Sequence, residues 1–164
     1  MARPSRPSDP ENATGQPRTF FVTTSTAGAR SLFQTARMAE LLIDVLRSCV
    51  KAGRFKIHDF VIMPSHLHIL LTLPGAVSIE KSMQLIKGGF SFRAKRELGF
   101  PGEIWQRGFS DVRIVDESSF EKHRSNINNN PVKAGLTSIP EEYPYGTASL
   151  KQRKLAGLKP RINL

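Results

Sequence analysis

Two histidines separated by one residue are the first positions in this 164-residue sequence whose types and spacing could do chemistry. His66 and His68 lie in the segment MPSHLHILLTLP, which has the apolar content of a β-strand. Residues two apart in a strand project from the same face, about 6.6 Å apart along the backbone, so the two imidazoles could converge on one metal ion. From spacing alone, a pair of surface histidines on a half-solvated sheet is the simpler interpretation, because two ligands do not make a metal site.

A second candidate is the segment NINNNPVKAGL, residues 126–136. On a helix, Asn126 and Asn130 lie on one face about one turn apart. The amide oxygen of Asn130 would suit Mg²⁺ or Mn²⁺ beside two imidazoles. The alternative is a plain helix C-terminus, since asparagine tolerates left-handed backbone and Pro131 blocks continuation.

His123 lies three residues before Asn126 and is a further candidate, as a nucleophile or a general base. Packing of this histidine beside Phe120 and Ile127 is the simpler explanation.

The elements that must position these residues follow from hydrophobic periodicity and turn signals. We expect strands at residues 18–27, 55–63, 66–74 and 104–115, with the middle two joined by a tight turn at Pro64-Ser65. We expect helices at residues 35–51, at 79–98 with Ser78 as cap and an interruption or bend near Gly88-Gly89, and at 117–130 with a stop near Pro131. The order predicts an α+β fold, a ferredoxin-like split βαβ sheet with helices on one face and an added C-terminal helix.

The chain length fits one domain with a sizeable core. Residues 1–17 hold many prolines and almost no large apolar residue, which predicts a disordered leader before a domain at residues 18–150. Residues 151–164 are basic and loosely patterned, which predicts a flexible tail. A single cysteine excludes an internal disulfide and a thiolate metal cage. With no membrane-spanning apolar run and no secretory signal, the sequence predicts a cytoplasmic protein.

The balance of charge favours a polyanionic partner. The chain has 24 Lys and Arg against 14 Asp and Glu, a net charge of +10. Neutralising phosphates releases counterions and drives binding to nucleic acid. Six basic positions are candidate DNA-backbone contacts, with a solvated basic face as the alternative: Lys87, Arg93, Lys95, Arg96, Arg107 and Arg113.

Three ordered segments together resemble a known family. MPSHLHILL resembles the His-hydrophobe-His (HUH) metal-binding motif of the single-tyrosine transposases. IWQRGFSDVRI resembles the tryptophan-containing strand after their second helix, and NINNNPVKAGL with the later YPYGTAS resembles the final block of the REP-associated tyrosine transposase branch. The resemblance covers residues 18–150 and is specific because the blocks occur in order over one domain.

The resemblance implies a bacterial-type, nucleoid-associated protein that binds single-stranded or hairpin DNA, as a monomer or a homodimer. Family members cut and rejoin DNA through a tyrosine, with a divalent ion such as Mg²⁺ or Mn²⁺ on the phosphate. Carried over by position, His66, His68 and Asn130 match the three metal ligands. The last predicted helix matches the catalytic helix.

The sequence departs from the family at the nucleophile, because Asn126 occupies the tyrosine position and a carboxamide cannot form a phosphotyrosine ester. The chain has two tyrosines, Tyr143 and Tyr145, both beyond the predicted helix stop. One hypothesis is therefore a transposase, active through a substitute nucleophile or recently inactivated. The other is a catalytically inactive, domesticated or decayed DNA-binding module. A weaker third is a ferredoxin-like RNA-binding domain, which predicts exposed aromatic residues on the central strands.

Overall fold

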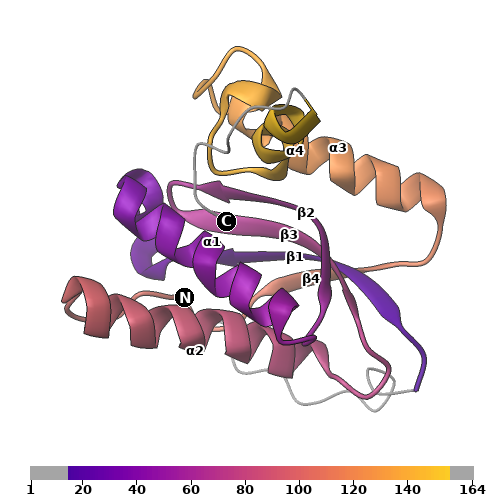
Figure 1. Ribbon diagram of the computed structural model, residues 1–164, viewed down its shortest axis with the longest axis horizontal. Coiled ribbons are helices and arrows are strands. Elements are labelled where there is room, and N and C mark those ends of the chain that lie inside the picture. The colour runs from indigo at the N-terminus through magenta and orange to yellow at the C-terminus, as the bar shows by residue number, and fades with distance from the viewer. Residues whose placement is uncertain (1–14, 156–164) are drawn as a thin grey trace.

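The chain folds around one four-stranded antiparallel sheet, seen in a computed structural model that describes residues 15–155 and the side chains up to residue 151 (Figure 1). The strands are β1 (Arg18–Ser25), β2 (Lys56–Met63), β3 (His66–Leu73) and β4 (Ser110–Ile114). The α-helices are α1 (Ala36–Lys51), α2 (Ile79–Leu98), α3 (Glu117–Lys133) and α4 (Thr147–Leu155). Short 3₁₀ turns, η2 to η4, lie at Ala27–Ala29, Leu32–Gln34 and Pro140–Glu142.

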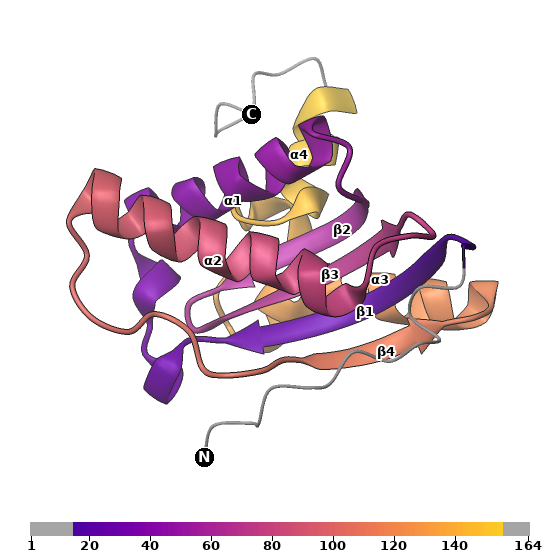
Figure 2. The same cartoon turned by 90° about the horizontal axis from the view of Figure 1, so that it is seen from below.

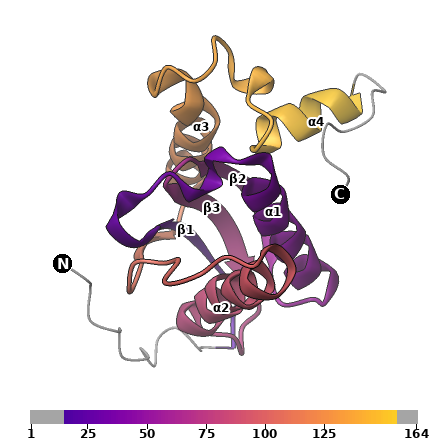
Figure 3. The ribbon, with the colours of Figure 1, turned by 90° about the vertical axis from the view of Figure 1, so that its left-hand side faces the viewer.

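The strand order β2-β3-β1-β4 is that of the predicted ferredoxin-like sheet, so the fold prediction is confirmed. Helices α1 and α2 pack side by side on one face of the sheet, and α3 crosses the opposite face (Figures 2 and 3). No helix within residues 15–155 has the length and apolar character needed to cross a membrane.

The two faces of the sheet bury two separate hydrophobic clusters. On β3, the alternate residues Leu67, Ile69, Leu71 and Leu73 are buried in the main core under α1 and α2, on the face opposite His66 and His68. The intervening residue Leu70 is equally buried, in a smaller cluster between the sheet and α3. Both faces of β3 are therefore covered along part of its length, which alternation alone did not predict.

A β-bulge in β2 changes which side chains reach the α3 face. The register shifts between Ile57 and Asp59, so His58 is the extra residue. Ile57 packs against the main core, whereas His58 contacts Phe120 of α3. Asp59 forms an ion pair with Arg124 of the same helix. Two consecutive residues of β2 thus point toward α3, which strict strand alternation forbids.

Two helices are more continuous than predicted. Helix α2 runs without interruption through Gly88 and Gly89. Its packing against α1 offsets the low helix propensity of the two glycines. A Cβ atom added at Gly89 would lie 3.5 Å from Val45 of α1, so this glycine sits in the contact between the two helices. Helix α3 continues through Pro131 to Lys133, with the proline ring buried.

The fourth strand and the tail also differ from the prediction. Strand β4 is limited to Ser110–Ile114. Upstream of it, Trp105 forms only a single bridge, to Thr26, and its side chain packs in the main core. Residues 151–155 of the predicted flexible tail belong to helix α4. The leader at residues 1–14 and the tail at residues 156–164 lie outside the described residues.

Candidate metal and nucleic-acid site

His66 and His68 form a close pair on the α3 face of the sheet. Their ring centroids are 4.6 Å apart in an edge-on arrangement. The Nδ1 atom of His68 lies 2.8 Å from the hydroxyl of Thr23, and that of His66 lies 3.2 Å from the hydroxyl of Ser65. Hydroxyl partners of this kind hold the orientation of a metal-binding imidazole and leave the Nε2 atom for the ion.

The environment keeps both imidazoles neutral. Burial lowers the pKa of His66, and burial together with the charge of His66 lowers the pKa of His68 to about 4. A neutral imidazole is the form that binds a divalent cation. The pair therefore fits a metal ion in both geometry and protonation.

Within residues 15–155, no group of three His, Cys, Asp or Glu side chains could share a metal ion. Among these residues, a third protein ligand beside the histidine pair must therefore be of another type. An amide oxygen is suitable, and waters complete the shell of Mg²⁺ or Mn²⁺.

Helix α3 runs parallel to β2 across the face of the sheet that carries the histidine pair. Near its start, the ring of Phe120 lies 5.1 Å from that of His58. Two turns later, Ile127 is buried in the same cluster as Val61, the strand partner of His68. The C-terminal half of α3 therefore approaches the end of the sheet that carries the histidine pair.

One flank of α3 carries the three helix positions singled out from the sequence. The ring of His123 lies 4.8 Å from that of Phe21, on β1, so this flank is turned toward β1. Asn126 and Asn130 follow at intervals of three and four residues and share the flank. Asn126 is exposed and Asn130 half-buried, and no hydrogen bond joins Asn130 to either imidazole among the described residues.

The side chain of His123 is tied to its own helix. Its Nδ1 atom lies 2.7 Å from the carbonyl oxygen of Ser119 and therefore carries the proton. The ring packs on Phe21 rather than only beside Phe120 and Ile127, the neighbours expected from the sequence.

The two tyrosines are packing residues. Tyr143 is buried, and its hydroxyl donates a hydrogen bond of 2.6 Å to the carbonyl oxygen of Ile62. Burial, with the neighbouring Tyr145, raises the pKa of Tyr143 to about 12. Burial also raises the pKa of Tyr145, which packs against both hydrophobic clusters. Neither phenol is poised to ionise at neutral pH.

The six basic candidates are divided by their surroundings. Lys87 donates hydrogen bonds to the carbonyl oxygens of Gln106 and Gly108, and Arg93 forms ion pairs with Asp44 and Glu97. The other four are exposed: Lys95, Arg96, Arg107 and Arg113. Helix α2 carries four of the six candidates and lies on the face of the sheet opposite α3 and the histidine pair (Figure 3): Lys87, Arg93, Lys95 and Arg96.

Sequence reasoning missed His58, Asp59 and Thr23 as partners on the α3 face. The available signal was the pair His-Asp inside the otherwise apolar strand segment KIHDFVIM. The RNA-binding alternative required exposed aromatic residues on the central strands. Phe20 is buried and Phe21 is half-buried beneath His123, so that requirement is not met.

The sheet, the paired histidines and the helix across them define a transposase domain of the HUH type. The family described as "Transposase IS200 like" matches residues 21–130, and the chain belongs to this family. It is 28% identical over 131 residues to the REP-associated tyrosine transposase of Escherichia coli K12, covering 79% of this chain and 75% of that protein. It is 29% identical over 96 residues to a putative REP-associated tyrosine transposase of Haemophilus influenzae, covering 52% of this chain and 54% of that relative, about half its length.

Solved structures agree with this assignment. A REP-associated tyrosine transposase bound to a REP hairpin is similar with a TM-score of 0.70 and 26% identity, over 98% of this chain and 89% of that one. A putative transposase from Deinococcus radiodurans has a TM-score of 0.53 at 18% identity, over 70% of this chain and 91% of that one. At that identity, the second likeness concerns the fold alone.

Proposed function

We propose that this protein binds hairpin or single-stranded DNA and a divalent metal ion at the histidine pair, without forming a phosphotyrosine link. Asn126 stands at the family's tyrosine position. The observation that carries the proposal is the state of the only two tyrosines, Tyr143 and Tyr145, both of which pack against the protein.

Hairpin DNA is the proposed partner because the similar solved transposase is bound to a REP hairpin. The net charge of +10 supports a polyanionic ligand. The exposed basic residues Lys95, Arg96, Arg107 and Arg113 are the proposed backbone contacts. Lys87 and Arg93 are weaker candidates, since both already serve carbonyl or carboxylate groups of the protein.

The proposed metal ligands are His66 and His68, with Asn130 as the third. The neutral imidazoles and their hydroxyl partners support this ligand set. Mg²⁺ or Mn²⁺ is the proposed ion, and when bound it would polarise a phosphate oxygen of the DNA. The protein's own residues would bind the DNA and orient that phosphate.

Without a tyrosine hydroxyl at position 126, the proposed site has no group to attack the DNA phosphate and start strand transfer. The amide of Asn126 has no ionisable hydroxyl, although its helix flank is turned toward β1. The hydroxyl of Tyr143 donates a hydrogen bond to the carbonyl oxygen of Ile62, which argues against Tyr143 as a substitute nucleophile.

The test is a comparison of the unmodified protein with Asn126→Tyr on an end-labelled hairpin with Mn²⁺, resolved on a denaturing gel. We expect no covalent band from the unmodified protein and a band from Asn126→Tyr, because the phenol would stand one turn before Asn130. Asn129→Tyr is the matched control, because Asn129 lies two residues after the buried Ile127, on the side of α3 that faces away from the sheet, and its side chain bonds Ser125. It should give no band.

A covalent band from the unmodified protein would overturn the proposal and point to Tyr143, Tyr145 or His123 as the nucleophile. Failure to retain the hairpin at low salt, measured by fluorescence anisotropy, would overturn the DNA-binding part. A metal titration gives the third readout, since His66→Ala should abolish Mn²⁺ binding.

A further inference from the structure

Asp59 is a buried carboxylate that joins three elements. Its side chain is only 1% exposed. The Oδ1 atom accepts hydrogen bonds from the Thr147 hydroxyl at 2.7 Å and from the Lys151 ammonium at 3.0 Å, both on α4. The Oδ2 atom lies 2.8 Å from Nε of Arg124 on α3, as an ion pair. One side chain of β2 thus contacts both C-terminal helices.

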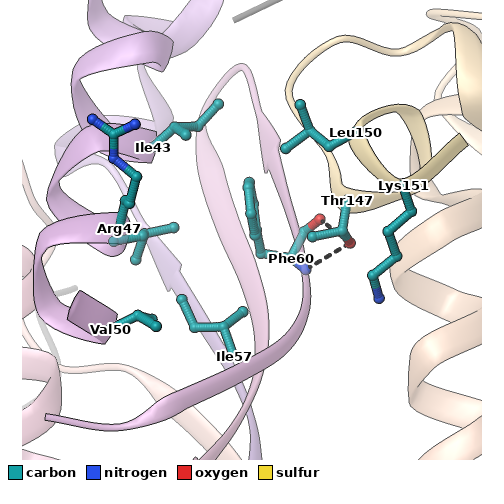
Figure 4. Close-up of a pocket in the computed structure, with 9 residues that line it drawn as sticks. Ile43, Arg47, Val50, Ile57, Phe60, Thr147, Leu150 and Lys151 are labelled. Carbon is teal, nitrogen blue, oxygen red and sulfur yellow. Dashed lines mark hydrogen bonds between the residues drawn. The ribbon is translucent and has the colours of Figure 1, made fainter. Parts of the chain in front are cut away.

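The bulge in β2 accounts for the position of this carboxylate. Because His58 is the extra residue, Asp59 pairs with Leu70 and points to the α3 face. Figure 4 shows Thr147 and Lys151 beside β2, where the Thr147 hydroxyl also accepts a hydrogen bond of 3.1 Å from the backbone nitrogen of Phe60. A carboxylate so deeply buried persists only when cations and donors surround it.

The contact with Arg124 bears directly on the orientation of α3. The buried residues of that helix are Ile127 and Pro131, a narrow apolar stripe that fixes the depth of the helix but restrains its rotation weakly. Phe120 contacts His58 near the start of the helix, and one further contact lies on each flank: His123 against Phe21, and Arg124 against Asp59.

We propose that Asp59, acting through Arg124, is a positioning residue that sets the rotation of α3 over the histidine pair. Arg124 precedes Asn126 by two residues and Asn130 by six, on the opposite flank of the same helix. A turn of the helix that releases Arg124 therefore moves both asparagines relative to His66 and His68. The contribution of this rotation to metal binding rests on the proposed function.

The test uses Arg124→Gln, because Arg124 is 39% exposed and the buried Asp59 keeps Thr147 and Lys151 as partners. Two spin labels, at Lys133→Cys on α3 and Glu40→Cys on α1 in a Cys49→Ser background, report the distance between the helices without any metal. Mn²⁺ affinity is measured in parallel on unlabelled protein, at a temperature where every variant is fully folded. Lys122→Gln is the matched control, an exposed residue of the same helix with the same change of charge.

We expect Arg124→Gln to broaden the distance distribution and to weaken Mn²⁺ binding roughly tenfold, the scale seen when an outer partner of a metal ligand is lost. Arg124→Lys should recover part of both effects, and Asp59→Asn should reproduce the defect. Lys122→Gln should match the unmodified protein.

An unchanged distance distribution in folded Arg124→Gln would overturn the proposal. A displaced helix with unchanged Mn²⁺ affinity would support the positioning role and remove Asn130 from the proposed ligand set. If the unmodified protein binds no Mn²⁺, the proposed metal site fails, and the distance measurement alone still decides whether Asp59 positions α3.

Discussion

Replacing Tyr143 with phenylalanine removes one oxygen atom and separates two roles that a tyrosine could have in this protein. The hydroxyl donates to the carbonyl oxygen of Ile62, on β2. The backbone nitrogen of Ile62 donates to the carbonyl oxygen of Tyr145 at 2.8 Å. The N–H and C=O groups of one strand residue point to the same side, so these two tyrosines satisfy the outer edge of β2 where a fifth strand would pair.

The expected loss follows from that single bond. The phenylalanine ring keeps the apolar contacts, whereas the Ile62 carbonyl loses its partner in a buried setting. A buried hydrogen bond removed from one side costs about 1–2 kcal/mol of unfolding free energy. For a domain of this size, that corresponds to a fall in Tm of roughly 2–8 °C. Tyr145→Phe is the control, since the Tyr145 hydroxyl has no hydrogen-bond partner among the described residues, and it should change Tm little.

Alkaline pH gives a second readout with a definite sign. The folded pKa of Tyr143 is raised to about 12 from an ordinary 10.0, mainly by burial. The unfolded phenol therefore releases its proton first, and the stabilisation is complete below about pH 10 and lost as pH rises toward 12. The difference in stability between the unmodified protein and Tyr143→Phe should shrink over that range.

Urea unfolding at pH 7 and at pH 11 measures both effects. If Tyr143→Phe were as stable as the unmodified protein at pH 7, the structural role assigned to the hydroxyl would be refuted. If the variant instead abolished a covalent DNA adduct formed by the unmodified protein, Tyr143 would be the substitute nucleophile.

Three further predictions concern the histidine pair, α3 and the basic residues. In EDTA, the unfolding free energy should fall as pH drops from 6.5 toward 4, because His68 is protonated in the unfolded chain but stays neutral in the folded protein. In urea titrations, His68→Gln should show a smaller decrease of unfolding free energy with falling pH. Ile127→Ala should cost about 2–4 kcal/mol and speed amide exchange in α3, since Ile127 is 1% exposed; unchanged exchange would show that other contacts hold the helix. Lys87→Met should lower Tm and leave the salt dependence of hairpin binding unchanged, because its ammonium serves two backbone carbonyls. Arg107→Gln should leave Tm unchanged and reduce the slope of log K against log salt by about one. If instead Lys87→Met reduced the slope and Arg107→Gln lowered Tm, Lys87 would be the DNA contact and Arg107 the structural residue.

The predicted fold succeeded where local signals act. The alternating residues Leu67, Ile69, Leu71 and Leu73 of β3 lie in the main core, and the Pro64-Ser65 turn fixed the register of β2 against β3. Periodicity located α1 and α2 to within a residue at their ends. These patterns depend on neighbours a few positions apart, which the sequence records directly.

The errors arose where distant contacts override local preference. Gly88 and Gly89 weaken an isolated helix, but α2 packs on α1 and stays continuous. Pro131 lacks a backbone donor, yet its ring is buried and the helix continues to Lys133. In both cases burial against another element outweighs a local propensity of about 1–3 kcal/mol.

The sequence by itself determined the order of elements and the shared face of His66 and His68. Both follow from residue identity and spacing, whereas the placement of Asn126 at the family's tyrosine position is what the resemblance implies. Only the tertiary structure decided that Tyr143 is committed to the edge of β2, that Lys87 serves backbone carbonyls, and that Asp59 is buried between α3 and α4. Each of these depends on partners 19 to 92 positions away, and the position of Asp59 depends also on a bulge in β2. No local pattern encodes which distant group a side chain will meet.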